Sequence, residues 1–163
     1  MRVSDEFKGN IIKEYDFWTL LLHTHQLPHL GRCYIWWRDR GKHDIGEGLA
    51  LWEIHPKPLL EGLQKIPRDI LKACKALGHN TEAYGTEFLL NTTYLANEMF
   101  HHKAQLHVHF IPRYKQPLRV EGLGITCVED RHWGKHYAPM SEQAPLPAHD
   151  LSTIRLAMAA AIG

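Results

Sequence analysis

The stretch QLHVHFI, residues 105–111, alternates polar and apolar residues over its first five positions and ends at Pro112. Successive side chains of a strand point to opposite faces, so the apolar residues of this stretch are expected to enter the core. Neighbours on the remaining polar face stand about 6 to 7 Å apart, a spacing at which several donors can hold one phosphate group or two imidazoles can hold one metal ion. The residues of that face are Gln105, His107 and His109.

The rest of the sequence predicts further strands and four helical stretches before and after this segment. Apolar runs of strand length occupy residues 17–24, 32–38 and 87–91. Helical spacing predicts a short amphipathic helix over 4–15, interrupted helical turns within 49–63, and a clear helix over 67–77 that ends at Gly78. A C-terminal helix is expected over 151–162, capped by Asp150. This order predicts one α+β domain, residues 1–163, built on a mostly antiparallel sheet.

The composition excludes several other classes of protein. With 163 residues, 44% of them hydrophobic and 23% charged, the chain is large enough for a sizeable core and too apolar for a disordered segment. Because 19 basic residues face 18 acidic ones, bulk attraction to nucleic acid or to a membrane is not indicated. Three distant cysteines, without a CxxC pair, argue against a disulfide framework. A reducing cytoplasm and no membrane association are therefore expected.

The stretch QLHVHFIPRY resembles the signature of the histidine triad (HIT) hydrolases and transferases, His-φ-His-φ-His-φ-φ, where φ is apolar. The resemblance spans residues 17–114, about 60% of the chain, and is closest to the bacterial branch of the family. It also includes FWTLLLH, LGRCYIWWRDRGKH and LLNTTYLAN in the family's order. It implies an α+β HIT-like fold, with an antiparallel sheet, a packed helix and a C-terminal helix, and it implies a homodimer.

The resemblance also implies a reaction at the α-phosphate of a nucleotide. The middle histidine of the family, matched by His107, forms a nucleotidyl-histidine intermediate that water or another acceptor resolves. His109 matches the third triad histidine, which helps bind phosphate oxygens, and Asn91 matches the family's asparagine near the phosphate. His43 resembles a histidine on the nucleotide side, and Asn97 follows closely enough to approach a ligand.

Gln105 departs from the family pattern, because glutamine stands at the first triad position. Its amide can donate and accept hydrogen bonds but cannot titrate. Attack by His107 is expected to survive this change, while the leaving-group preference is left open. The expected substrate is a phosphoanhydride, phosphoramidate or dinucleoside polyphosphate, and the scheme requires no metal and no cofactor.

Three other interpretations remain open from the sequence. The chain could bind or sense nucleotides without turnover, as the glutamine suggests. His101, His102, His107 and His109, or the segment 129–136, could form a metal site. The basic and aromatic residues between Arg32 and Lys42 could bind single-stranded nucleic acid, although a strand would place Trp36 and Trp37 on opposite faces.

Several residues are interpreted as structural. Arg113 and Tyr114 are assigned no chemical role, and Cys33 and Cys74 are expected in the core because they fall on apolar faces. Most of the other histidines are interpreted as surface or satisfied polar groups, namely His23, His25, His29, His55, His79 and His149.

Overall fold

The computed structural model describes residues 8–38, 56–78, 86–91, 107–113, 117–118, 128–135 and 139–163. Its main element is an antiparallel sheet of five strands in the order β1-β2-β4-β6-β5. The strands are β1 (Ile11–Glu14), β2 (Trp18–Leu22), β4 (Cys33–Trp37), β6 (His107–Pro112) and β5 (Thr86–Asn91). The strands predicted over 17–24, 32–38, 87–91 and 105–111 are thus confirmed where the chain is described.

The first strand corrects a prediction. Helical spacing over 4–15 predicts an amphipathic helix, but residues 11–14 form the edge strand β1, which pairs with β2. Ile11 lies opposite Leu21, and Glu14 lies opposite Thr19. A short apolar run is compatible with the period of a helix and with that of a strand. Here the segment forms a strand because it can hydrogen-bond to the edge of β2.

Helical turns run without a break from residue 56 to residue 76. They comprise α2 (Pro56–Leu60), the π-helical segment η2 (Glu61–Lys65) and α3 (Ile66–Ala76), with helical backbone angles at the junctions. The predicted helix over 67–77 is confirmed, and Gly78 ends it with a φ of 87°. The turns expected within 49–63 are helical where they are described, although Pro58 does not interrupt them.

The C-terminal helix α5 (Ala148–Ile162) is confirmed, but it begins three residues earlier than predicted. Its N-cap is Pro147, so Asp150 lies in the first turn rather than at the cap. The other end of the helix contacts the edge strand β1. There the Lys13 ammonium donates hydrogen bonds to the carbonyl oxygens of Ile162, at 2.9 Å, and Gly163, at 2.5 Å.

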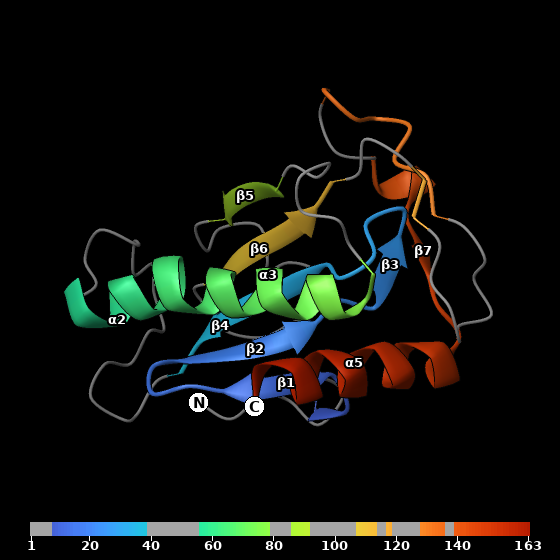
Figure 1. Cartoon of the computed structure of the whole chain (residues 1–163). Coiled ribbons are helices and arrows are strands. Elements are labelled where there is room, and N and C mark those ends of the chain that lie inside the picture. Colours follow the sequence, from blue (N-terminus) through green and yellow to red (C-terminus); the bar gives the residue numbers. More distant parts are fainter. Residues whose placement is uncertain are drawn as a thin grey trace, which may run out of the picture.

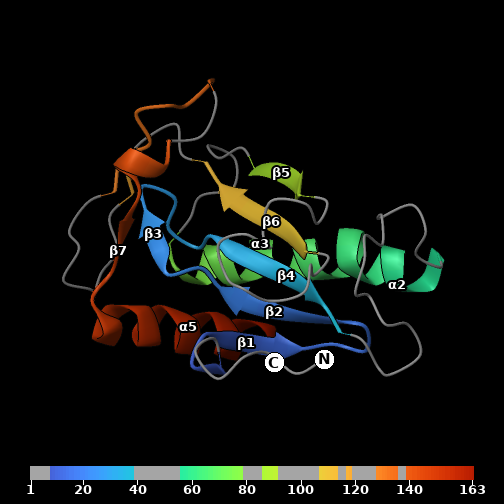
Figure 2. The same ribbon diagram turned by 180° about the vertical axis from the view of Figure 1, so that it is seen from behind.

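The hydrophobic core lies between one face of the sheet and the helices α3 and α5. Figure 1 shows both helices in front of the strands, and Figure 2 shows β4 and β6 in front of α3 from the opposite side. Alternate residues of the central strands join the core with Ile70 of α3 and Met158 of α5, and Cys33 and Cys74 are buried as expected. The core residues from β2, β4 and β6 are Trp18, Leu20, Leu22, Cys33, Ile35, Val108 and Phe110. This architecture confirms the α+β class and fits the fold that the resemblance implies.

A second, two-stranded sheet lies beyond the ends of β2 and β4 (Figure 1). It pairs β3 (His25–Leu27) with β7 (Ala144–Pro145). Gln26, which is fully buried, ties the connection between β2 and β4 together. Its amide nitrogen donates to the carbonyl oxygens of His23 and Arg32, and its amide oxygen accepts from Gly31 N–H at 2.7 Å. The sequence did not predict this sheet because its strands are only two and three residues long.

Candidate functional site

His107 and His109 lie on the face of β6 that points away from the helical core. Val108 and Phe110, which alternate with them, are fully buried in that core. The two imidazole rings are 5.0 Å apart between centroids, at an interplanar angle of 61°. His107 is 7% exposed, while His109 is partly exposed. The alternation of the sequence therefore brings His107 and His109 together on one face.

The neighbouring strand β4 adds aromatic side chains to the same face. Tyr34 lies directly opposite His109, and Trp36 lies opposite His107. The Tyr34 ring is 4.7 Å from the ring of His109 and 5.9 Å from that of His107, in edge-on arrangements. Trp37 turns to the core face, where its ring stacks on Phe17. The two adjacent tryptophans thus point to opposite faces, as the strand pattern predicts.

His23 is a further histidine of this site, which the sequence analysis assigned to the surface or to satisfied polar groups. It is 6% exposed, and its ring lies 4.5 Å from Tyr34 and 6.5 Å from His109. Its Nδ1 atom accepts the backbone N–H of His25 at 2.8 Å. The available signal was the alternation of β2, which continues through Thr19 and Leu21 to His23. Only the pairing of β2 with β4 shows that this alternation leads to Tyr34.

Burial keeps two of these imidazoles neutral. It lowers the pKa of His109 to about 3, with smaller contributions from His107 and Arg32. It lowers the pKa of His23 to about 2, and the Arg32 guanidinium acts in the same direction. A neutral imidazole has one N–H donor and one acceptor nitrogen. Because Nδ1 of His23 accepts a hydrogen bond, its proton is on Nε2. Nδ1 of His109 is buried and has no hydrogen-bond partner among the described residues.

The other predicted site residues are placed only in part. Asn91 pairs with His107 in the β5–β6 register, so its backbone lies beside the triad strand. Gln105, His43 and Asn97 lie outside the described residues. The structure therefore brings together His107, His109 and the backbone of Asn91.

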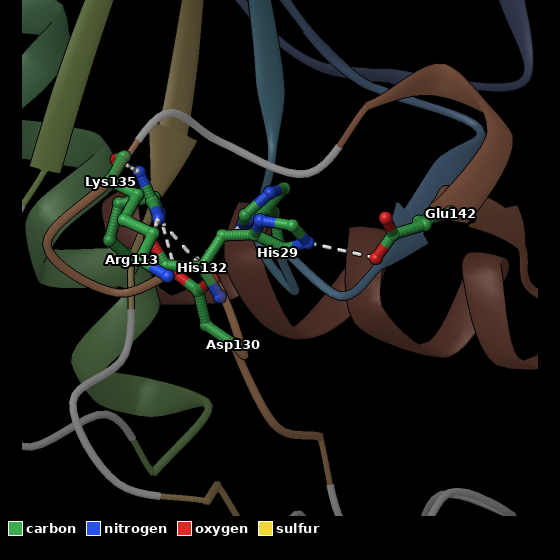
Figure 3. Close-up of polar contacts among 6 residues, drawn as sticks. All are labelled: His29, Arg113, Asp130, His132, Lys135 and Glu142. Atoms are coloured by element: carbon green, nitrogen blue, oxygen red, sulfur yellow. Dashed lines mark hydrogen bonds and ion pairs between the residues drawn. The ribbon is translucent and has the colours of Figure 1, made fainter.

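A buried ion pair lies at the end of β6 (Figure 3). Arg113 directly follows β6, and its Nε atom donates to a carboxylate oxygen of Asp130 at 2.5 Å. The side chains are 3% and 0% exposed. Arg113 also donates to the carbonyl oxygens of His132 and Lys135, and the second Asp130 oxygen accepts the His132 N–H at 3.0 Å. Arg113 thus has a structural role, because it binds the turn at 130–135 to the triad strand.

Two histidines lie beside this ion pair (Figure 3). His29 is 1% exposed, and its Nδ1 atom is 3.9 Å from Asp130. Burial lowers the pKa of His29 to about 4, although the Asp130 carboxylate opposes that shift. His132 is hydrogen-bonded through Nε2 to Glu142 at 2.8 Å. These contacts connect three segments of the chain that are distant in sequence.

Within the described ranges, no group of three or more His, Cys, Asp or Glu side chains is placed to hold a metal ion. Among the helices that the structure describes, none is long and apolar enough to cross a membrane.

Comparison with known proteins gives one structural likeness. No family model matches the chain, and no curated protein sequence matches it. The structure is similar to that of a Hit-like protein from Bartonella henselae, described as involved in cell-cycle regulation and crystallised with an unknown ligand. The TM-score is 0.47 and the sequence identity 17%, covering 93% of this chain and 85% of the other. The resemblance of this chain to the histidine triad family rests on its own residues.

Proposed function

We propose that this protein is a HIT-type nucleotide hydrolase or nucleotidyl transferase that acts at the α-phosphate of its substrate. The observation that carries the proposal is the pair His107 and His109, held side by side on one face of β6 with ring centroids 5.0 Å apart. Their spacing in the sequence and the Ile-Pro-Arg that follows match the HIT signature. The proposal includes the homodimer that the resemblance implies.

The proposed reaction has two displacements at phosphorus. In the first, a ring nitrogen of His107 forms a bond to the α-phosphorus, and the bond from phosphorus to the leaving group breaks with its electron pair. In the second, a water or acceptor oxygen attacks the same phosphorus. The bond to nitrogen then breaks with its electron pair, so that His107 is regenerated; water gives the nucleoside monophosphate, and any other acceptor leaves carrying the nucleotidyl group. Two easier steps replace one difficult transfer.

The other residues assigned to the site bind the phosphate and the nucleotide. His109 supplies a neutral imidazole next to His107, because burial keeps its pKa at about 3. Its N–H meets the charge that develops on the phosphoryl oxygens. Gln105 and Asn91 are proposed as additional phosphate donors, and His43 and Asn97 as contacts to the nucleotide.

The test is a single-turnover experiment with the purified protein and an α-phosphate-labelled dinucleoside polyphosphate or nucleoside phosphoramidate. The reaction is quenched in alkaline denaturant, because the bond between phosphorus and imidazole nitrogen is labile in acid. A labelled protein adduct is expected within one turnover, and His107→Ala is expected to abolish both adduct and product.

The matched control is His149→Ala, which removes an exposed imidazole from α5 on the other side of the sheet and should react like the parent. If the parent forms no adduct and His107→Ala is equally active, the proposal is wrong. Binding of AMP by calorimetry without any product would identify a nucleotide-binding protein instead.

A further inference from the structure

Tyr34 lies at the centre of the histidine cluster, yet the reaction proposed above gives it no role. Its ring is within 6 Å of three imidazoles, at 4.5 Å from His23, 4.7 Å from His109 and 5.9 Å from His107. Tyr34 stands directly opposite His109 on the neighbouring strand, so its side chain is on the face of the sheet that carries the two histidines. A phosphoryl group bound between His107 and His109 would lie beside the Tyr34 ring.

The hydroxyl of Tyr34 has no hydrogen-bond partner in the described part of the chain, and the side chain is only partly buried. Burial raises the pKa of Tyr34, although the Arg32 guanidinium opposes this shift. The phenol thus keeps its proton at neutral pH and is an O–H donor.

The Tyr34 ring is held in place by groups that belong to the fold. His23 packs against it at an interplanar angle of 34° and is itself fixed by the N–H of His25. Gln26 in turn fixes the backbone of His23, because its amide donates to the carbonyl oxygen of that residue. A donor that is oriented before the substrate arrives loses little entropy when it binds.

We propose that Tyr34 is a further catalytic residue of this site, whose hydroxyl donates a hydrogen bond to a non-bridging oxygen of the phosphoryl group transferred to His107, and that His23 is its positioning residue. The inference rests on the proposed function and extends it to a residue outside the triad. A neutral donor suits this task because negative charge builds up on the non-bridging oxygens as the bond to His107 forms. The proton stays on the tyrosine throughout, so the steps at phosphorus are unchanged.

The decisive variant is Tyr34→Phe, which removes the hydroxyl and keeps the ring that contacts the histidines. We expect its melting temperature to match that of the parent and its kcat/KM to fall about 10- to 100-fold, the range for one hydrogen bond to a charged group. Calorimetry separates a contact with phosphate from a structural role. Tyr34→Phe should weaken AMP binding and leave adenosine binding unchanged, whereas a distorted site would weaken both.

The matched control is Tyr15→Phe. Tyr15 is a buried tyrosine whose hydroxyl donates to Asp69 of α3, on the helical side of the sheet. This variant is expected to lose stability and to keep the kcat/KM of the parent.

The positioning role of His23 is tested by His23→Leu, which removes the ring and should lower kcat more than it raises KM. His23→Phe keeps a ring against Tyr34 and should recover part of the loss.

The outcomes separate the inference from the proposed function. If the parent turns over and Tyr34→Phe keeps its full kcat/KM, Tyr34 makes no such contact and the inference is overturned, while the proposed function stands. If the parent binds AMP without turnover, the proposed function fails. The calorimetric comparison then decides the contact alone: weaker binding of AMP but not of adenosine supports it, and equal binding overturns it. If the parent binds neither AMP nor adenosine, the inference and the proposed function are both overturned.

Discussion

Arg113 and Asp130 form an ion pair that is almost completely removed from water, with side chains 3% and 0% exposed. Removing two charges from water is unfavourable, and the pair is stable only because the charges are close and the remaining donors and acceptors are satisfied. Both conditions are met here. Asp130 also accepts the His132 N–H, and Arg113 also donates to the Lys135 carbonyl oxygen at 3.0 Å.

Replacing one partner of this pair should therefore be costly. Arg113→Met leaves the Asp130 carboxylate buried without its counter-charge, so the free energy of unfolding is expected to fall by about 3–5 kcal/mol. Urea unfolding at pH 7.5 measures the change. The control is Arg131→Ala, in a pair with Glu129 whose side chains are 81% and 56% exposed, and its effect should stay below about 1 kcal/mol. Equal effects of the two substitutions would show that Arg113 and Asp130 are not a buried pair.

His23 makes stability depend on pH. Burial lowers its pKa to about 2 in the folded protein, against an ordinary value near 6.5 when unfolded. The unfolded state therefore binds the extra proton below about pH 6.5, and stability that is fully present above this pH is lost as the pH falls. Between pH 6 and pH 5, the free energy of unfolding of the parent should fall as the pH is lowered. The slope of this fall should be about 1.4 kcal/mol per pH unit steeper in the parent than in His23→Gln.

Urea unfolding of both proteins at pH 7.5, 6 and 5 tests this prediction. His29 and His109, whose pKa values are also lowered by burial, add to the slope of the parent and of the variant alike. Parallel curves for the parent and His23→Gln would mean that His23 is solvated in the folded protein.

For single residues, the sequence predicted which face of β6 carries His107 and His109 but not which residues of other segments contact them. The faces of His107 and His109 follow from alternation within one strand, which is a local rule. The contact of His23 with Tyr34 requires the register of β2 on β4, and that of Arg113 with Asp130 joins residues 17 positions apart. No local periodicity specifies such pairs, so they could not be predicted.

At the scale of elements, the helical stretch 56–76 is shaped by one proline and one glycine. Pro67 has no N–H, and in an α-helix its ring would clash with the carbonyl four residues earlier. The preceding turn is π-helical, with the Ile66 N–H bonded to the Glu61 carbonyl oxygen, which widens the helix at this place. On the same turn Gly62 faces Trp18, whose indole N–H donates to the Pro58 carbonyl oxygen at 2.7 Å.

Gly62→Ala should destabilise the protein because there is no space for a methyl group. A Cβ atom at this position would lie 2.6 to 2.8 Å from the indole of Trp18, which is fully buried and cannot move aside. We expect the free energy of unfolding to fall by about 1–3 kcal/mol, even though alanine favours a helix. Gly9→Ala is the control: apart from its chain neighbours, no atom of the described residues lies within 4 Å of a Cβ added there, so the free energy of unfolding should change little. A Gly62→Ala variant as stable as the parent would contradict the close approach of η2 to β2.

The elements also show why the opening segment was predicted wrongly. Phe7, Ile11, Ile12 and Tyr15 follow a helical period, but the period of four apolar residues is a weak signal. The strand is stabilised by hydrogen bonds to β2 and by its contact with α5, in which Lys13 donates to the carbonyl oxygen of Ile162, 149 residues further along the chain. The longer apolar face of α3 needs no such partner to be recognised, so that helix was predicted correctly.

At the scale of the whole molecule, the sheet separates the residues that stabilise the fold from those that carry the proposed chemistry. Buried residues of β2 and β6 that lie outside the helical core, Leu21 and Ile111, share the other side with the histidines. Since α3 and α5 pack on the core side, their substitution should change stability without reaching the site (Figure 1).

Met158→Ala tests this separation. Met158 of α5 is fully buried in the core, so truncating it leaves a cavity and should lower the free energy of unfolding by about 2–5 kcal/mol. Leu156, on the same helix, is 56% exposed, and Leu156→Ala should stay within about 0.5 kcal/mol of the parent. Below the melting temperature of Met158→Ala, its affinity for AMP should equal that of the parent, because the sheet lies between α5 and His107. A loss of affinity in the folded variant would show that the two sides of the sheet are coupled.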